Sequence, residues 1–346
     1  MNTSELFNLT VWIKTEIEGT SLQKKYQELQ SILQQNTVVN RQKAAFHNQK
    51  EALLTLIKNI PLYSLTKDQI AFLDKLGIGH VLGEEGINTI EDVLYRNALD
   101  MATAAGRIQQ MIQVLNSGIE KARKINDGMT GCVLLEQHKL DDDILVRISF
   151  TGHASMANVK DFRNWGKTWY EIGRGIAMVH NSSPEDIRIV GATNGSIVIE
   201  MAVIASIATT ASSIILAALK VAERVLEIKK KAEEIRGLKL LNKKLALDLE
   251  KEAETEKKGG VVQISAEMIK ELNINLNTEG DKVTAFEKAV ANLVNFIESG
   301  GEVDFVAPMK ENKDEDGDTV SPEYESLRNT FTKIRQLENR VKLLES

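Results

Sequence analysis

An uncharged segment in the second half of the chain, Met201 to Leu219, constrains the fold more than any other feature. Its length is about that needed for a helix to cross a bilayer. Its strongly hydrophobic residues supply only a few kcal/mol of insertion energy, and its three serines and two threonines oppose insertion. Glu200 lies at the upstream edge, and no Trp or Tyr anchors either end. We therefore expect a buried helix of a soluble protein, with a membrane-inserting helix as the alternative.

Small residues recur at every fourth position of this segment, at Ala205, Thr209, Ser213 and Ala217. A ridge of small side chains lets a second helix approach closely, in water or in lipid. Apolar residues continue the helix at a spacing of 3 and 4, and a last helix after residue 321 carries a second apolar stripe. We expect interaction with a partner through Ala205, Thr209, Ser213, Ala217, Val221, Val225, Ile228, Leu327, Phe331, Ile334 and Val341.

The sequence as a whole predicts an α+β fold that is predominantly helical. Its 346 residues suggest two globular units, or one unit with helical extensions, and few prolines and long stretches rich in Ala, Leu, Glu and Lys favour helices. The expected regions are helices over 1–125, an α+β unit over 126–200, a long apolar-to-charged helix with a coiled-coil-like extension over 201–258, a small α/β segment over 259–308, an acidic disordered linker over 309–320, and an amphipathic C-terminal helix over 321–346.

The α+β unit is predicted to have the order β-β-α-β-β. Short apolar runs at 133–136 and 144–150 suggest an antiparallel pair, and Asn194-Gly195 is a strong signal for a second hairpin. Between them, an apolar stripe at spacings of 3 and 4 predicts a helix and consists of Phe162, Trp165, Trp169, Ile172, Ile176 and Val179. Because aliphatic residues continue this stripe, we expect core packing rather than a stacking site. Further on, we expect a break at Gly259-Gly260, a strand over 261–264, a helix over 282–297 and a strand over 303–306.

The order of features over residues 145–240 resembles uncharacterised bacterial proteins of phage defence and mobile elements. It comprises a Ser183-Pro184-Glu185-Asp186 turn, an Asn194-Gly195-Ser196 hairpin, a helix of small residues and a helix rich in Lys and Glu. The resemblance implies a bacterial, phage-defence context and no catalytic residue.

Motifs with a known chemistry are not found. Gly166-Lys167-Thr168 matches the end of a phosphate-binding loop, but Asp161 stands where the first glycine is required. The five histidines show no paired spacing for a metal, and one cysteine excludes cysteine-based zinc sites. Cys132 with His138 and His153 is the best enzyme-like set, and a buried cysteine is the better interpretation. We predict no catalytic residue, no cofactor and no metal.

The charge balance, 43 − 49 = −6, argues against broad electrostatic binding to nucleic acid. The first 20 residues have no secretory signal, so we expect a cytoplasmic protein. Lysines near 229–244 alternate with glutamates, which favours a solvated helical face over phosphate binding. The sequence thus predicts a non-enzymatic assembly or interaction protein, either a homo-oligomer or bound to a protein partner. The alternatives are a membrane-acting effector that inserts residues 201–219, and an enzyme whose site is built from dispersed residues.

Overall fold

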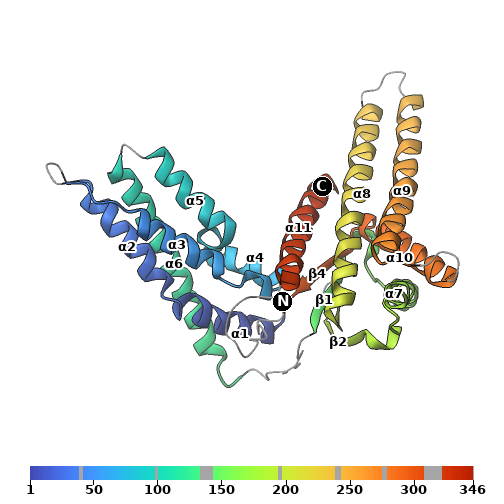
Figure 1. Ribbon diagram of the computed structural model, residues 1–346, viewed down its shortest axis with the longest axis horizontal. Helices are drawn as coiled ribbons and strands as arrows, with labels where there is room; N and C mark the ends of the chain where they lie inside the picture. The colour runs from blue at the N-terminus through green and yellow to red at the C-terminus, as the bar shows by residue number, and fades with distance from the viewer. Residues whose placement is uncertain are drawn as a thin grey trace. The chain divides into compact units, whose positions relative to one another are not determined.

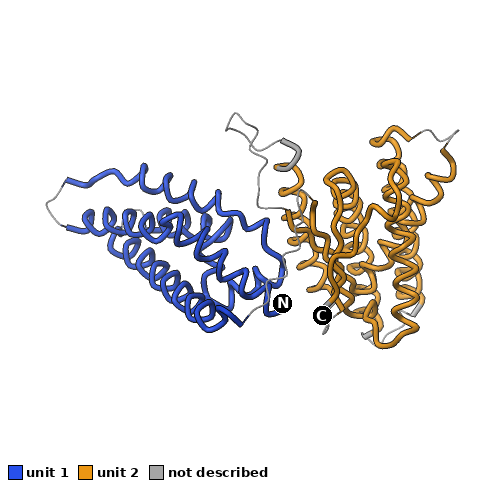
Figure 2. Tube along the Cα trace, turned by 90° about the horizontal axis from the view of Figure 1, so that it is seen from below, with its two compact units in different colours: residues 1–137 blue, residues 138–346 orange. Residues whose placement is uncertain are grey.

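The computed structural model describes residues 1–38, 42–97, 100–132, 143–193, 197–237, 243–274, 279–307 and 322–345. The described residues form eleven α-helices and one antiparallel sheet of four strands, which confirms the predominantly helical α+β prediction. The chain divides into two compact units, residues 1–137 and 138–346 (Figures 1 and 2). The expected strand at 133–136, the Asn194-Gly195 turn and the acidic segment 309–320 lie outside the described residues.

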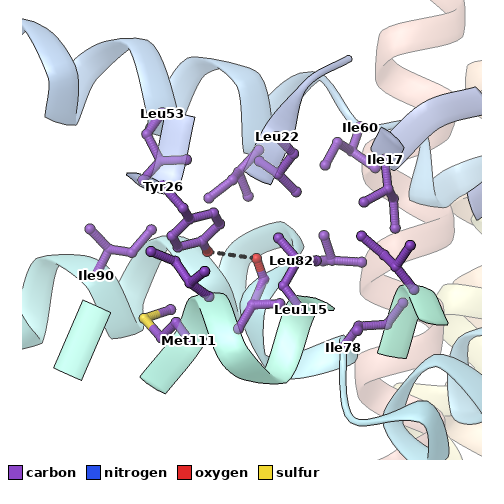
Figure 3. Close-up of a cluster of buried hydrophobic side chains, with 14 of the residues drawn as sticks. Ile17, Leu22, Tyr26, Leu53, Ile60, Ile78, Leu82, Ile90, Met111 and Leu115 are labelled. Carbon is purple, nitrogen blue, oxygen red and sulfur yellow. Dashed lines mark hydrogen bonds between the residues drawn. The ribbon is translucent and has the colours of Figure 1, made fainter. Parts of the chain in front are cut away.

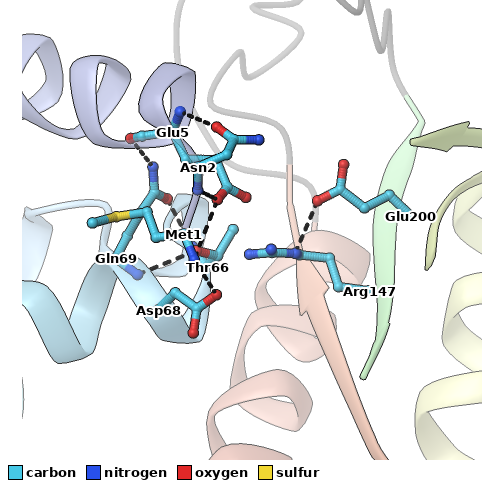
Figure 4. A network of polar contacts seen from close by, with 8 residues as sticks. All are labelled: Met1, Asn2, Glu5, Thr66, Asp68, Gln69, Arg147 and Glu200. Atoms are coloured by element: carbon cyan, nitrogen blue, oxygen red, sulfur yellow. Dashed lines mark hydrogen bonds and ion pairs between the residues drawn. The ribbon is translucent and has the colours of Figure 1, made fainter. Parts of the chain in front are cut away.

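Unit 1 is helical. Its α-helices are α1 (Thr3–Trp12), α2 (Leu22–Gln35), α3 (His47–Asn59), α4 (Lys67–Leu76), α5 (Gly83–Arg96) and α6 (Met101–Met129), and a π-helix over Ile13–Glu18 follows α1. Two helices begin with a capping box, formed by Asn2 and Glu5 for α1 and by Thr66 and Gln69 for α4 (Figure 4). In each pair, the side chain of either residue accepts a hydrogen bond from the backbone N–H of the other. Such caps satisfy backbone donors that helix starts leave unpaired.

The core of unit 1 is organised around Tyr26 on α2. Its hydroxyl donates a hydrogen bond to the carbonyl oxygen of Val81 at 2.9 Å, across 55 residues of sequence (Figure 3). Burial raises the pKa of this hydroxyl, so it stays protonated and keeps its role as donor. Leu22, Leu29 and Leu33 on the same face of α2 are fully buried, as the 3-and-4 spacing of the sequence predicts.

Unit 2 is built on the sheet, whose strand order is β2-β3-β1-β4. Its elements are β1 (Ile144–Phe150), α7 (Val159–Val179), β2 (Arg188–Thr193), β3 (Ile197–Val203), α8 (Ala205–Gly237), α9 (Lys243–Glu271), α10 (Gly280–Glu298), β4 (Glu302–Val306) and α11 (Pro322–Glu345). The central strand β1 pairs with β3 on one edge and with β4 on the other, so Ile148 faces both Ile199 and Val303. The sheet thus joins segments that are distant in sequence.

The core of unit 2 lies between one face of the sheet and helices α7, α8 and α10. Four aromatic rings meet there, with Phe296 of α10 at the centre: its ring centroid lies 5.4 Å from that of Phe150, 5.3 Å from Trp165 and 5.1 Å from Trp169. The edge-to-face angles of these pairs are the favoured geometry for aromatic rings. From Trp165 onward the stripe is therefore part of the core, as expected, whereas Phe162 at its start is 56% exposed, which corrects the prediction for that residue. On the opposite face, Arg147 of β1 forms an ion pair with Glu200 of β3 at 3.0 Å (Figure 4).

Two features of unit 2 differ from the prediction. Met201 to Val203 complete strand β3 rather than opening a helix, because they pair with β1, and α8 begins at Ala205. The predictions of a break at Gly259-Gly260 and of a strand over 261–264 were wrong, because α9 continues through both glycines to Glu271.

Close packing of α8 against α9 explains why Gly259 and Gly260 do not end α9. The pairs Arg236–Glu250 and Arg224–Glu256 show that the two helices run antiparallel. A Cβ atom on Gly260 would come within 2.5 Å of a methyl group of Val221, so glycine permits the contact. Tertiary packing here outweighs the helix-breaking tendency, about 1 kcal/mol for each glycine.

Two glycines of α7 provide a matched test of the packing between α7 and α10. A Cβ on Gly175 would lie 2.5 Å from the carbonyl oxygen of Ala285 and 2.5 Å from the Cβ of Ala289, whereas a Cβ on Gly166 would meet nothing within 4 Å. We expect Gly175→Ala to lower the free energy of unfolding by about 1–3 kcal/mol, because it forces the helices apart. Gly166→Ala should raise it by about 0.5–1 kcal/mol through helix propensity. Chemical denaturation of both variants checks this, and two shifts of the same sign would contradict it.

Glu298 at the end of α10 joins three helices. Its carboxylate forms ion pairs with Lys229 of α8 and Lys257 of α9. Burial alone would raise the pKa of Glu298, but the hydrogen bonds and charges of the two lysines outweigh burial and lower the pKa. A carboxyl whose pKa is lower in the folded state stabilises the fold above the ordinary Glu range.

We therefore predict that the stabilisation from Glu298 is complete at neutral pH and is lost as the pH falls through the lowered pKa. Glu298→Gln should cost about 1–3 kcal/mol at pH 7 and much less at low pH, because it removes a buried charge partner. Denaturation of the variant between pH 7 and pH 3 measures this difference. Glu227→Gln on the exposed side of α8 is the control and should change stability by less than about 0.5 kcal/mol. An equal loss at both pH values would contradict the prediction.

Candidate interaction surfaces

The structure places the predicted contact residues of α8 in two settings. Ala205, Thr209, Ser213, Ala217 and Ile228 are half-buried. Val221 and Val225 are almost fully buried, and so are four neighbours that were not predicted as contacts: Ala208, Ser212, Ala218 and Ala222. The most buried small residues thus lie beside the predicted ridge rather than on it. Contact of the ridge with a partner stays a prediction.

The apolar stripe of α11 is covered within the chain. Leu327, Phe331, Ile334 and Val341 are each at most 5% exposed. Phe331 stacks on Phe305 of β4, with ring centroids 4.8 Å apart and planes 10° from parallel. In this conformation the stripe offers no apolar surface to a partner.

α11 also closes the edge of the sheet. The outward-facing N–H of Val303 donates to Glu338 at 3.1 Å, and Arg335 donates to the outward carbonyl oxygen of Phe305 at 2.9 Å. Arg335 pairs in addition with Asp304 at 2.7 Å. An uncovered edge strand is a template for pairing with another chain, and a covering helix removes that template. The C-terminal helix therefore protects β4.

Truncation of Phe331 separates this role from an exposed contact. Phe331→Ala should lower the free energy of unfolding by about 3–5 kcal/mol, because it opens a cavity against Phe305. Gln336→Ala on the exposed side of α11 should change it by less than about 0.5 kcal/mol. Thermal denaturation with light scattering measures both stability and assembly. Native stability combined with an altered assembly state would show that the stripe serves a partner instead.

The membrane candidate of the sequence lies in the interior of unit 2. The helix over Ala205–Arg236 is long and apolar enough to cross a membrane, and 61% of its most apolar window is buried. It packs against α9, α10 and α11, which surround it within the unit. A core helix of a soluble protein passes the same length and composition test, so this finding is weak evidence for membrane insertion.

A pocket of about 210 Å³ lies between the turn after β1, the start of β4 and α11. Its polar groups bond to one another: the hydroxyl of Thr151 donates to the carbonyl oxygen of Gly300 at 2.5 Å, and Lys342 pairs with Glu302 at 2.8 Å. Glu338 accepts the Val303 N–H described above. These bonds are structural, so the lining residues offer no activated nucleophile.

Unit 1 has a wider open cleft of about 920 Å³ at the start of α3 and the end of α5. Phe46, Leu94 and Met101 form its apolar part, and Lys50 and Glu91 at the rim form an ion pair of 3.2 Å. The charges of Lys50 and Glu91 neutralise each other, so this pair gives no preference for a charged ligand.

The enzyme-like and metal candidates gain no support from the described residues. Within the ranges that the structure describes, no three His, Cys, Asp or Glu side chains come together as a metal site. Cys132 is exposed, not the small buried residue that the sequence favoured, and His138 lies outside the described residues. Asp143 is not free to bind a cation, because its carboxylate forms an ion pair with Arg188. Near the C-terminal end of α7, burial lowers the pKa of His180, whose Nε2 lies 2.7 Å from the hydroxyl oxygen of Thr210.

The exposed side of α7 carries a group of four cations. Lys160, Arg163, Lys167 and Arg174 are all exposed there. Within the described part of the chain, their cationic groups have no hydrogen bond or ion pair. The Asn158 side chain caps the helix start by accepting from the N–H groups of Lys160 and Asp161.

The two acidic residues of α7 do not neutralise these cations. Asp161 accepts a hydrogen bond from the backbone N–H of Ala157 at 3.1 Å, in the turn that precedes the helix. Glu171 pairs with Lys288 of α10 at 3.1 Å and is directed toward that helix. Both acids are therefore engaged away from the exposed side, which keeps a local positive charge on a chain with a net charge of −6.

The apolar stripe of the helix alone does not reveal this surface. The signal was present in the same residues: positions opposite the Trp165 and Trp169 stripe hold four cations at helical spacing and a single acid, Glu171. The Gly166-Lys167-Thr168 sequence belongs to this helix and not to a loop between strand and helix. A phosphate-binding loop is therefore absent at this place.

Comparison with known proteins gives no relative. No family model, no curated protein and no solved structure matches the chain.

Proposed function

We propose that this protein is a non-enzymatic interaction protein that binds an anionic partner through the basic side of α7, defined as Lys160, Arg163, Lys167 and Arg174. The observation that carries the proposal is that these four exposed cations lack a counter-charge among the described residues. Unpaired cations on one rigid element create a local positive potential, which favours encounter with a negatively charged surface. The net negative charge elsewhere on the chain would orient such an encounter.

The rigidity of α7 supports this role. The buried side of the helix is fixed by Trp165 and Trp169 against Phe296 and by the close contact of Gly175 with α10. A binding surface on a packed helix loses less conformational entropy on binding than one on a loop. The four cations are therefore presented in a fixed arrangement.

Assembly through α8 and α11 is less favoured as the main function, because the apolar stripes expected to mediate it are largely covered inside unit 2. Self-association through other surfaces is compatible with binding through α7. A bacterial phage-defence context remains a proposal from the order of features in residues 145–240.

Charge removal tests the proposal. The variant with Arg163→Gln, Lys167→Gln and Arg174→Gln should elute from a heparin column at clearly lower salt than the native protein, because it loses three of the four cations. The control carries Lys220→Gln, Lys230→Gln and Lys231→Gln on the exposed side of α8 and reaches the same net charge, −6 − 3 = −9. It should elute close to the native protein.

Two results would contradict the proposal. One is a native protein that flows through the column at low salt. The other is an equal loss of retention in both variants, which would show that total charge or the α8 lysines determine binding. Thermal denaturation of each variant verifies that the fold is intact, since all six positions are exposed.

A further inference from the structure

The basic side of α7 adjoins exposed apolar residues. Val159 is 84% exposed, and Phe162 and Tyr170 are each 56% exposed. Large apolar side chains that remain in water singly are common, but three on one helix beside a group of cations form an amphipathic surface. We call these three residues the apolar strip of α7.

The helical geometry separates the two kinds of side chain. At about 100° per residue, Phe162, Val159 and Tyr170 follow one another around the axis, and next come Arg163, Arg174, Lys167 and Lys160. The apolar strip and the basic side therefore run in parallel along the helix. A partner that contacts both must present apolar and anionic groups side by side over several helical turns.

We propose that α7 docks on an anionic lipid surface, with the apolar strip at the boundary between headgroups and acyl chains and the basic side among the headgroups. This inference rests on the proposed function, since it names the anionic partner of the same side of α7. Interfacial helices combine aromatic and aliphatic residues with Lys and Arg in this way. Tyrosine also suits the headgroup level, because its ring is apolar and its hydroxyl is polar.

Lipid fits the surface better than nucleic acid. Val159 is the most exposed of the three apolar residues, and an aliphatic side chain can neither stack on a base nor bond to one. Val159 can contribute favourable binding free energy only by leaving water, which the boundary with the acyl chains permits.

Docking through α7 differs from insertion of the apolar helix. α8 stays covered by α9, α10 and α11, and unit 2 keeps its core while only the outer side of α7 leaves water. Reversible, salt-sensitive binding is then expected. Each cation near an anionic surface contributes only about 1 kcal/mol of electrostatic binding free energy, and salt weakens this attraction.

The test uses the full chain and two kinds of vesicle, one of phosphatidylcholine alone and one with about a third phosphatidylserine. Co-sedimentation should show binding to the anionic vesicles only, and the binding should weaken as salt is raised. The variant with Arg163→Gln, Lys167→Gln and Arg174→Gln should bind about 100-fold more weakly, at roughly fivefold for each cation. The α8 control with Lys220→Gln, Lys230→Gln and Lys231→Gln should bind like the native protein.

A second variant removes the apolar strip and keeps every cation: Val159→Ser, Phe162→Ser and Tyr170→Ser. It should bind anionic vesicles at least about tenfold more weakly, because apolar burial is lost. Its elution from heparin should not change. Val159→Ser alone, at the most exposed of the three positions, should show a smaller loss in the same direction and guards against misfolding of the triple variant.

The outcomes separate the two proposals. Failure of the native protein to bind anionic vesicles, while it binds a single-stranded or duplex oligonucleotide through the same cations, would overturn the lipid inference and leave the proposed function standing. Binding to vesicles that is equal in the native protein and the apolar-strip variant would also overturn it. If heparin retention is absent in the native protein, both proposals fail.

Discussion

Burial of α8 is the constraint on which the organisation of unit 2 depends. The first half of this helix has no charged residue, so most of its surface has to be covered by apolar groups or by lipid. The chain covers it with the sheet and with α9, α10 and α11, which come from later parts of the sequence. Glu298 then joins α8, α9 and α10 at one point through Lys229 and Lys257. The last helix completes this enclosure and shields the β4 edge at the same time.

Local patterns predicted an element well where the sequence of that element alone determines which of its sides is buried. The 3-and-4 spacing of Leu22, Tyr26, Leu29 and Leu33 indicates a buried helical face, and the structure confirms it. The stripe of α7 from Trp165 onward is another example, because an apolar stripe on a helix has to meet a core. Phe162 at its start is an exception, since it is 56% exposed.

Predictions failed or stayed open where distant segments meet. Gly260 is helical because Val221 of another helix lies against it. The sequence around Gly260 does not reveal that contact. Likewise, the stripe of α11 predicts that something covers it, but periodicity does not distinguish a partner from the chain's own β4 and α8. The pairing of β1 with β4 across more than 150 residues made the covering surface intramolecular.

The candidate surface on α7 could have been found from the sequence by examining both sides of the helix. An apolar stripe identifies the side that faces the core, and the composition of the opposite side is then open to selection for solubility or for binding. A solvated side usually mixes charges of both signs, because that keeps the surface soluble without a large local field. On α7 the cations stand alone with exposed Val159, Phe162 and Tyr170, while Glu171 is turned to Lys288 of α10. Docking on an anionic surface, as proposed, would bury the exposed parts of these three side chains.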